Sequence, residues 1–338
     1  MTEFSINKDR KIDVIAIGRV TIDFNPNEIN RPLDESRTFS KYLGGSPANV
    51  VIGLSRLGKK AGFIGKVSND QFGRYVKKVF EHEGVDTSHV VTSTGNDTLG
   101  LTFTEMKSPT ESSILMYRSE ASDLKLNVSE IDEAYISKAK ILLVSGTALA
   151  ASPSREAVFK AIEFAKKHQV KIIFDLDYRN YTWRNDEETA IYYSLVARQS
   201  SLMIGSREEF DLTGGLLGHT ELSDEEIASY WMNEGPNEIV VIKHGKEGSS
   251  AFTKNHKKVK VPAYPAKVLK SFGGGDAHGS AMIYCLLENY GIEKALHFAS
   301  ASAAINIGSH SSSESLPTVD EIKAYMEKVG SPFEKIQG

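Results

Sequence analysis

The segment with the clearest potential for chemistry is Ser271–Ser280, SFGGGDAHGS, and the helical run Ala281–Leu287 follows it. Its three consecutive glycines, Gly273–Gly275, tolerate positive φ and leave their backbone N–H groups exposed. At the start of a helix, such N–H groups and the positive end of the helix dipole form an anion site. A carboxylate beside a bound anion is unfavourable unless it has a task. Asp276 would have one as the base that takes a proton from a hydroxyl attacking a phosphoryl group. A glycine-rich turn with Asp276 as a simple helix cap is the alternative.

A second glycine cluster lies far upstream, in Gly44–Asn49, GGSPAN. Glycines ahead of a helix let a ligand approach the backbone closely, and the Asn49 amide offers both a hydrogen-bond donor and an acceptor. Such groups suit a polyol or a sugar better than a phosphate. A tight turn followed by a helix cap explains the same residues equally well, so the cluster alone leaves the choice open.

The segments that must position these residues alternate between short apolar runs and longer amphipathic stretches. The runs are apolar at nearly every position, as strands buried on both faces of a parallel sheet are. Between them, the serines of Ser46-Pro47 and Ser152-Pro153 are expected to cap helices, and the apolar residues of Pro153–His168 recur at helical spacing. This alternation predicts an α/β fold with a doubly wound sheet. The predicted strands are Ile12–Ile17, Ile141–Val144, Lys171–Phe174, Leu202–Ile204 and Glu238–Ile242.

Polar residues and glycines gather just after the predicted strands. In an open parallel sheet the carboxyl ends of the strands share one edge, and ligands bind there. Any one of these residues is explained as a solvated loop position, but together they indicate a crevice assembled from distant parts of the chain. They are Asp23, Asp175, Asp177, Arg179, Glu208, Lys243, Gly245 and Gly248.

Two segments, residues 24–43 and 98–118, interrupt the alternation, because they are rich in polar and strand-forming residues and carry no helical stripe. Leu99–Met106 and Ser112–Arg118 are expected to pair as a hairpin with Pro109 in its turn. We interpret the two segments as a small β lid over the main sheet, within a single domain that spans residues 1–338.

Composition excludes several other classes of protein. The chain has 338 residues, of which 40 are basic and 44 acidic, and this balance argues against a nucleic-acid partner. No apolar run is long enough to cross a bilayer, and the polar N-terminus is unlike a signal peptide, so we expect a cytoplasmic protein with no membrane partner. The single cysteine, Cys285, excludes an internal disulfide framework.

Gly53–Lys60 fails as a P-loop, because Lys60 stands where Ser or Thr must bind magnesium. The basic run Lys254–Lys260 is interpreted as a solvated hairpin.

Taken together, the motifs resemble those of the ribokinase-like carbohydrate kinases, also called the PfkB family. The N-terminal signature is Gly44–Asn49 continuing into Gly65–Gly73, and the C-terminal signature ends in Gly273–Asp276. The resemblance implies a Rossmann-like core, a β lid, and phosphorylation of a sugar-like hydroxyl by ATP with Mg²⁺. It also implies that Asp276 is the catalytic base.

The resemblance implies further site residues as well. The amides of Gly273, Gly274 and Gly275 would form an anion hole for the migrating phosphoryl group, and Glu208 would belong to the magnesium site. Lids of this family often pair in dimers, so a homodimer through the lid is an open possibility. The implied substrate positions are Asp23, Gly44, Gly45 and Asn49, and the implied nucleotide positions are Lys243, Gly245, Gly248, Gly273 and Gly275.

Within the family, several stretches resemble kinases that act on a linear keto acid at its terminal hydroxyl. A carboxylate favours guanidinium partners, whose planar fork can bind it through two hydrogen bonds. Arg118, which follows Tyr117 on the proposed lid, and Arg179 match carboxylate-binding positions of the related 2-keto-3-deoxygluconate kinases. A surface ion pair is the alternative for each arginine. The resembling stretches are Ile22–Val50, Ser113–Leu126, Phe174–Trp183 and Gly205–Phe210.

The chain departs from the family pattern at two places. Where the family usually has Asp-Thr-x-Gly-Ala-Gly-Asp, this chain has Lys270 in the first position, in place of an acid associated with monovalent-cation binding in some members. We therefore expect activity largely independent of K⁺. The family's Asn-x-x-Glu is matched by Gly205–Glu208, so magnesium contacts through the asparagine would be lost or made through water.

Other functions remain open on sequence alone. The same chemistry with 2-keto-3-deoxygluconate, fructose or ribose is the nearest alternative. A non-catalytic sugar or nucleotide sensor on the same fold is another, although a sensor need not keep Asp276. A dinucleotide oxidoreductase is disfavoured, because no G-x-G-x-x-G follows the first predicted strand.

Overall fold

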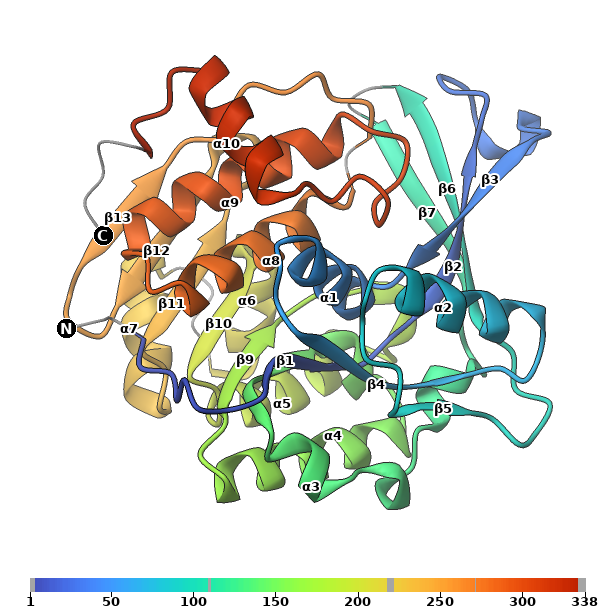
Figure 1. Ribbon diagram of the computed structural model, residues 1–338, viewed down its shortest axis with the longest axis horizontal. Coiled ribbons are helices and arrows are strands. Elements are labelled where there is room, and N and C mark those ends of the chain that lie inside the picture. Colours follow the sequence, from blue (N-terminus) through green and yellow to red (C-terminus); the bar gives the residue numbers. More distant parts are fainter. Residues whose placement is uncertain (1–3, 109–110, 218–221, 271, 334–338) are drawn as a thin grey trace.

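The computed structural model describes residues 4–108, 111–217, 222–270 and 272–333. A nine-stranded main sheet runs through the middle of the molecule in the order β13-β12-β11-β10-β9-β8-β1-β4-β5 (Figure 1). The strands from β11 to β5 in this order pair in parallel, and β12 and β13 form an antiparallel hairpin at one edge. The strands are β1 (Ile12–Ile17), β4 (Ala61–Val67), β5 (Val90–Thr92), β8 (Ala139–Ser145), β9 (Lys171–Asp175), β10 (Leu202–Ser206), β11 (Ile239–Lys243), β12 (Ser249–Thr253) and β13 (Lys258–Val261).

Helices cover both faces of this sheet, which confirms the predicted doubly wound architecture (Figure 1). One layer contains α1, α2, α8, α9 and α10, and the other contains α3 to α7. The helices are α1 (Ser46–Arg56), α2 (Gln71–His82), α3 (Glu133–Ile136), α4 (Ser154–Lys167), α5 (Asp186–Ala197), α6 (Arg207–Gly214), α7 (Asp224–Glu234), α8 (Gly274–Leu287), α9 (Ile292–Ile307) and α10 (Val319–Lys328).

The strands divide two hydrophobic cores between them. Along β1, Val14 and Ala16 pack into the core under α1, α8 and α9, while Ile15 and Ile17 pack into the core under α4, α5 and α7. Successive side chains of a strand point to opposite faces, so a sheet with a core on each side needs apolar residues at every position. That requirement explains why the predicted strands coincide so closely with the observed ones.

The two predicted helix caps are wrong. Gly45, with φ +102°, is the N-cap of α1, so Ser46 is already its first residue. The Ser46 hydroxyl instead donates to Asp175 Oδ2 at 3.1 Å. Helix α4 begins at Ser154, two residues later than its predicted cap at Ser152. In α1, a tertiary acceptor on β9 has taken the hydroxyl that local capping would have used.

A second, four-stranded sheet packs beside the main sheet, in the order β3-β2-β6-β7 (Figure 1). It contains the predicted hairpin, because β6 pairs antiparallel with β7. Pro109, expected in the turn, lies outside the described residues. β2 begins at Thr21, three residues before the start of the predicted lid segment. The strands are β2 (Thr21–Pro26), β3 (Phe39–Gly44), β6 (Gly100–Ser108) and β7 (Glu111–Tyr117).

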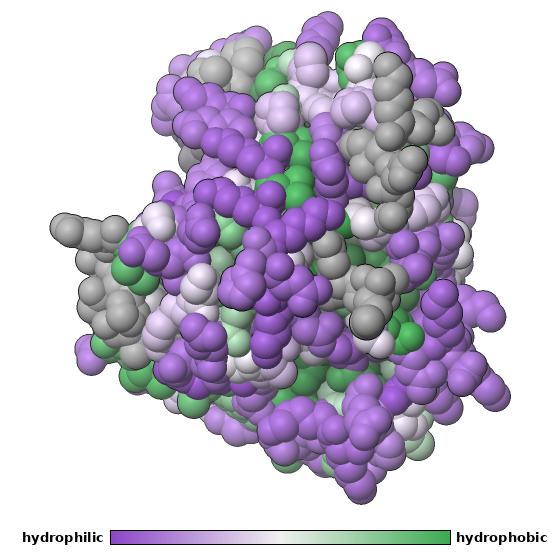
Figure 2. Space-filling view, turned by 90° about the vertical axis from the view of Figure 1, so that its left-hand side faces the viewer, coloured by the Kyte–Doolittle hydropathy of each residue, from purple (hydrophilic) through white to green (hydrophobic). Residues whose placement is uncertain are grey.

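The face of the molecule beside β13 is predominantly hydrophilic (Figure 2). Lysines such as Lys258 and Lys260 stand on this edge strand, and charged side chains on a sheet edge disfavour pairing with another chain. Across the described residues, the helices are all too short or too polar to pass through a bilayer.

Candidate active site

The predicted anion site falls at the start of α8. Gly273 adopts the left-handed conformation with φ +87°, and the helix begins at Gly274. The Ala277 N–H donates to the Gly273 carbonyl at 3.2 Å. This is the first hydrogen bond of the helix, so the N–H groups of Gly274, Gly275 and Asp276 come before it in the chain. They lie in the first turn, where N–H groups have no carbonyl partner in a preceding turn. They are therefore available to an anion.

Asp276 lies in the same first turn and meets the other glycine signature there. Its Oδ2 accepts a hydrogen bond from Asn49 Nδ2 at 2.7 Å, although the two residues are 227 positions apart in the chain. The side chain is partly exposed rather than packed beneath other residues. Helices α1 and α8 pack against each other, and this packing brings Asn49 to Asp276.

Lys243 places a positive charge beside the same helix end. It is the last residue of β11, and its Nζ lies 4.0 Å from Asp175 Oδ1 at the end of β9. A Cβ added at Gly275 would lie 3.5 Å from that Nζ, so the ammonium reaches the first turn of α8. The carboxyl ends of β9 and β11 thus meet the start of α8, as a parallel sheet predicts.

Several carboxylates crowd this edge. Burial raises the pKa of Asp175 to about 7, and the nearby charges of Asp177, Glu209 and Asp276 add to the rise, while Lys243 opposes it. Carboxylates held this close together favour a proton or a cation among them. This arrangement fits a site that receives a divalent cation along with phosphates.

Asp23 stands on β2, next to the glycines that precede α1. A Cβ at Gly44 would fall 2.0 Å from Asp23 Oδ1, so only glycine leaves room for this carboxylate. Burial raises the pKa of Asp23, and Arg19 together with hydroxyl groups such as that of Thr21 opposes the rise. Asp276 also acts on Asp23 through its charge and adds to this rise.

Arg179 and Asp177 form an ion pair at the end of β9. Arg179 Nη2 lies 2.8 Å from Asp177 Oδ1. Burial acts to raise the pKa of Asp177, but the guanidinium groups of Arg179 and Arg19 hold it below its usual value. Asp177 has φ +35° and also accepts hydrogen bonds from Ser145 and Thr147.

Arg118 is less accessible than the sequence suggested. Its Nε and Nη2 contact Asp123 Oδ2 at 3.0 and 2.5 Å, and Nη2 also donates to the Thr147 carbonyl. Two of its donor groups are therefore already bound. Among the described residues, Nη1 has no hydrogen-bond partner, and this atom is buried as well.

A hollow of about 860 Å³ opens beside Arg118, between the end of β7 and the loop that follows β9. Tyr117 lines it and is 61% exposed, and its ring packs edge-on against Phe103 within the second sheet. The hollow is wide and rich in arginine and tyrosine side chains. They include Arg118, Arg155, Arg184, Tyr181 and Tyr192.

The predicted nucleotide glycines lie on the connection between β11 and β12, in and after the short 3₁₀ helix Gly245–Glu247. Gly245 has φ +55° and is exposed, while Gly248 has φ +98°. A Cβ at Gly248 would lie 2.1 Å from the Val261 carbonyl oxygen, so this turn requires glycine. The connection follows Lys243 directly and thus flanks the start of α8.

Glu208 is exposed on α6, and its place in a magnesium site stays a prediction. Its neighbour Glu209 faces inward and acts on Asp175 through its charge. The Glu209 carboxylate accepts hydrogen bonds from the N–H groups of Tyr178 at 2.8 Å and Ser206 at 2.6 Å. A sequence signal existed, since Ser206-x-x-Glu209 is a capping box and fixes Ser206 as the helix start.

Sequence reasoning also missed Arg19 and Asp123. Arg19 is 4% exposed and follows β1 by two residues. Its Nη2 lies 3.8 Å from Asp177 Oδ2, and its Nε is buried without a partner. A buried guanidinium with so little compensation is costly. The sequence hint was an arginine at the end of a strand that is otherwise apolar.

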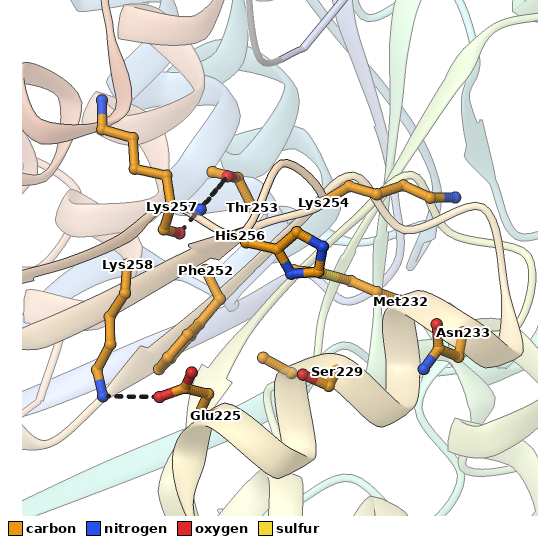
Figure 3. A pocket seen from close by; sticks show the side chains of 11 residues that line it. Glu225, Ser229, Met232, Asn233, Phe252, Thr253, Lys254, His256, Lys257 and Lys258 are labelled. Carbon is orange, nitrogen blue, oxygen red and sulfur yellow. Dashed lines mark hydrogen bonds and ion pairs between the residues drawn. The ribbon is translucent and has the colours of Figure 1, made fainter.

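A separate hollow of about 170 Å³ lies between α7 and the β12–β13 hairpin (Figure 3). Its lining includes Met232, Phe252 and His256, and Lys258 forms an ion pair with Glu225 at its rim. Ile239 pairs with Thr253, which places this hollow at the amino end of β11. It is therefore at the opposite end of the strands from Asp276 and does not belong to the candidate site.

Comparison with known proteins agrees with this geometry. Residues 11–319 match the model of the pfkB family carbohydrate kinase. A protein of Clostridium botulinum (strain Eklund 17B / Type B), named 5-dehydro-2-deoxygluconokinase, is 58% identical over 328 residues, which are 97% of this chain and 96% of the relative. A protein of Bacillus subtilis (strain 168) with the same name is 51% identical over 325 residues, covering 96% of this chain and 99% of the relative.

Solved structures show the same fold. A putative ribokinase II from E. coli in complex with ATP and Mg²⁺ superimposes with a TM-score of 0.85 at 23% identity, covering 94% of this chain and 100% of that chain. A PfkB protein from Polaromonas sp. JS666 superimposes with a TM-score of 0.79 at 25% identity, covering 93% of this chain and 99% of that chain. The chain belongs to the pfkB family of carbohydrate kinases.

Proposed function

We propose that the chain is a 5-dehydro-2-deoxygluconokinase, which transfers the γ-phosphoryl group of ATP to the terminal hydroxyl of 5-dehydro-2-deoxy-D-gluconate in inositol catabolism. Relatives of that name share 51% to 58% of their residues with it over nearly the whole chain. The structural observation that supports the proposal is the meeting of Asp276, Asn49 and Lys243 at the glycine-rich start of α8.

Asp276 is the proposed base. Its carboxylate accepts from Asn49, which orients it, and it is partly exposed to the crevice. It would take the proton of the attacking hydroxyl as the oxygen approaches the γ-phosphorus. Asp23 and Asn49, on the lid side, would hold the sugar-like part of the substrate through hydrogen bonds to its hydroxyls.

In phosphoryl transfer, stabilising the charge on the transferring group contributes more to catalysis than taking the proton does. The amides of Gly273–Gly275 and the Lys243 ammonium would receive that charge, and the approach of Lys243 Nζ to Gly275 supports this role. Gly245 and Gly248 would bring the backbone close to the nucleotide.

Magnesium fits the carboxylates of this site. Mg²⁺ is usually held by one or two carboxylates together with substrate phosphates and water. Asp175 and Glu209 would hold it, because their mutual repulsion is part of what raises the pKa of Asp175. When bound, the ion would neutralise charge on the β- and γ-phosphates. We assign this role to Glu209 in place of Glu208.

The substrate's carboxylate would sit among the arginines. In the described part of the chain, the buried donors Arg118 Nη1 and Arg19 Nε have no hydrogen-bond partner. Arg179 and Arg19 share the partner Asp177. A neutral sugar would leave these donors unpaired, which costs binding free energy. The arrangement therefore favours an acid over fructose or ribose.

A cytoplasmic location and a homodimer through the lid are part of the proposal. β7 is an edge strand of the second sheet, and it exposes Leu115 and Tyr117 at 45% and 61%. Exposed apolar side chains on an edge strand support a lid-to-lid contact. Sedimentation of the purified chain would test the dimer, and a lone monomer at micromolar concentration would contradict it.

A substrate panel tests the proposed function. ADP production is measured with 5-dehydro-2-deoxy-D-gluconate, 2-keto-3-deoxygluconate, fructose and ribose. We expect the first to give the highest kcat/KM, by at least about tenfold over the neutral sugars. Highest turnover with fructose or ribose would overturn the acid assignment. ATP binding without ADP production across the panel would favour the sensor alternative.

A further inference from the structure

Lys270 is a fully buried lysine that the proposed mechanism does not use. Its Nζ donates to the backbone carbonyl of Asn306 at 3.0 Å and to Asn306 Oδ1 at 3.1 Å. Both acceptors are neutral oxygens. An ammonium without a carboxylate partner is expensive to bury, so its retention in the core calls for a functional explanation.

The acceptor residue Asn306 is itself hydrogen-bonded to other segments, and we call this hydrogen-bonded group around Asn306 the junction. It is fully buried, and its Nδ2 donates to the Ser312 carbonyl at 2.8 Å and to Ser315 Oγ at 2.9 Å. The backbone N–H of Leu269 donates to the Ile307 carbonyl at 2.9 Å, so the chain on either side is pinned as well. Lys270 thus holds the end of α9 and the loop of residues 308–315 that follows it.

This junction lies directly behind the anion site. A Cβ placed on Gly273 would fall 2.7 Å from Asn306 Oδ1 and 2.6 Å from Ser312 Oγ. The Gly273 turn therefore rests on the two residues that the ammonium organises. A movement of Asn306 would displace the turn that aims the amides of α8.

The same loop also touches the lid sheet. The carbonyl of His310 accepts from Asn25 Nδ2 at 2.6 Å, and the His310 ring contacts the Tyr42 hydroxyl at 3.0 Å and the Pro26 carbonyl at 2.7 Å. The loop of residues 308–315 consequently joins β2 and β3 to the anion site, with Lys270 and Asn306 at its base.

The surroundings of Lys270 favour an ammonium in two respects. It donates to two oxygens of Asn306, and the charges of Asp276 and Asp23 act on it through space. Burial nevertheless lowers the pKa of Lys270 to about 8, against the effect of those two acids. A K⁺ ion would make the same kind of contacts with carbonyl and amide oxygens. In this chain the cation is the ammonium group of Lys270, which is covalently part of the protein.

We propose that Lys270 is a positioning residue whose ammonium acts as a tethered monovalent cation, holding Asn306 and the Gly273 turn in the geometry that phosphoryl transfer requires. A bound K⁺ does not fit beside it, because Lys270 Nζ already contacts both oxygens that Asn306 offers. The chain therefore carries its own cation in place of one drawn from solution.

The test is Lys270→Met, which keeps the length of the side chain and removes its charge. It rests on the kinase activity proposed above, so every rate is compared with that of the wild type on whichever substrate it turns over. We expect kcat to fall by about 10²-fold with little change in ATP binding, as when one preorganised electrostatic contact is lost. Lys267→Met is the matched control, because Lys267 is exposed three residues away, and its rate should stay at the wild-type level.

Rescue by small cations separates positioning from plain structural loss. We expect NH₄⁺ or K⁺ at about 0.1 M, exchanged for Na⁺ at constant ionic strength, to restore Lys270→Met at least about tenfold and leave the wild type unchanged. A substitution to alanine, with more room, should be rescued at least as well. A folded Lys270→Met with wild-type kcat, or with a loss that no cation reverses, would overturn the proposal. A wild-type protein without activity would instead contradict the proposed function, and it would not bear on the role of Lys270.

The pH profile gives a second readout that remains usable if Lys270→Met fails to fold. The charged ammonium is the active form, so wild-type kcat should fall as the pH rises through about 8. Lys270→Arg should keep its charge and move that fall to higher pH. If the alkaline limb is the same in both proteins, Lys270 does not control it and the proposal fails.

Discussion

Asp276 is the residue on which the chemistry of this site depends most directly. Replacing it with Asn keeps the hydrogen-bonding size of the side chain and removes its basicity. We expect Asp276→Asn to lower kcat by at least about 10³-fold, since the base and its orientation are lost together. Nucleotide binding, measured by calorimetry, should stay near the wild-type value. Residual activity above a tenth of the wild type would mean that another group takes the proton.

Arg19 is the residue that should decide between acids and neutral sugars. Its Nε is a buried donor that has no hydrogen-bond partner among the residues that the structure describes. We expect Arg19→Met to lower kcat/KM for the keto acid by about 10- to 100-fold, the cost of one hydrogen bond to a charged group. The much lower kcat/KM for fructose should hardly change. Arg198→Met removes an ion pair with Glu234 and contacts with Tyr230 and Trp231, none of which belongs to the candidate site, and it serves as the control. An equal loss for both substrates would assign Arg19 a structural role only.

At the residue scale, the sequence predicted types of chemistry better than positions. Asp276 and the glycines were singled out because amides at a helix start suit an anion and a carboxylate beside them needs a reason. Glu208 was chosen over Glu209 because the family motif was aligned without regard to where α6 begins. A shift of one residue along a helix turns the side chain by about 100°, so the two glutamates point in different directions. That Arg118 is held by Asp123 could not be predicted, because five residues of separation in a loop set no geometry.

Among the elements, the turn between β3 and α1 carries the strongest steric constraint. Gly45 has φ +102°, and a Cβ there would lie 2.6 Å from the Arg19 carbonyl oxygen. We expect Gly45→Ala to raise the KM for the sugar-like substrate by at least about tenfold and to lower stability by about 1–3 kcal/mol. The substitution would move Gly44 away from Asp23. Binding of the sugar-like substrate should therefore weaken, while ATP binding should not change.

Gly58 provides the matched control for that variant. It also has positive φ, +81°, but a Cβ there would meet nothing within 4 Å. Gly58→Ala should therefore cost about 1 kcal/mol of stability from backbone strain and leave KM unchanged. Steady-state kinetics and urea unfolding of both variants make the comparison. A similar KM in all three proteins would show that the turn does not position the substrate side.

The elements themselves were largely predictable, and the exceptions have physical causes. Strands β1, β8, β9, β10 and β11 were found because each is buried on both faces and needs apolar residues nearly throughout, whereas β4 and β5 were not predicted. The lid hairpin was found because its polar, strand-forming residues break that pattern. The cap of α1 was missed because Ser46 bonds to Asp175 across the sheet, and local sequence carries no information about that acceptor.

On the scale of the whole molecule, burial of His278 should shape the dependence of stability on pH. Burial lowers the pKa of His278 to about 3, and the charge of Lys243 adds to this. The unfolded chain binds a proton near pH 6.5 that the folded chain does not, so this contribution is complete above about 6.5 and is lost as the pH falls towards 3. At about pH 5 the loss is about 2 kcal/mol.

His278→Gln should remove that acid sensitivity. We expect the free energy of unfolding of the variant to change less between about pH 7.5 and about pH 5 than that of the wild type, by about 2 kcal/mol. His82→Gln, at an exposed position on α2, should follow the wild-type curve. Urea unfolding at both pH values makes the measurement, and parallel curves for all three proteins would contradict the expectation.

What the whole molecule adds to the sequence is the meeting of distant residues. Asn49 and Asp276 are 227 positions apart, and no spacing rule joins them. The topology does so, because strand ends of a parallel sheet share one edge and α1 packs on α8. The prediction that the polar residues after the strands converge held for Asp175, Asp177, Arg179 and Lys243, since it rested on this property of the architecture rather than on side-chain detail.

The hairpin at the edge of the main sheet offers a practical handle. Its turn, residues 254–257, is exposed and lies at the strand ends opposite the catalytic edge. The chain has one thiol, Cys285, and it is buried. A cysteine introduced at Asn255 would thus be the sole reactive sulfur for a maleimide dye or a sensor chip, and the immobilised molecules would all present their ligand-binding edge to the flow.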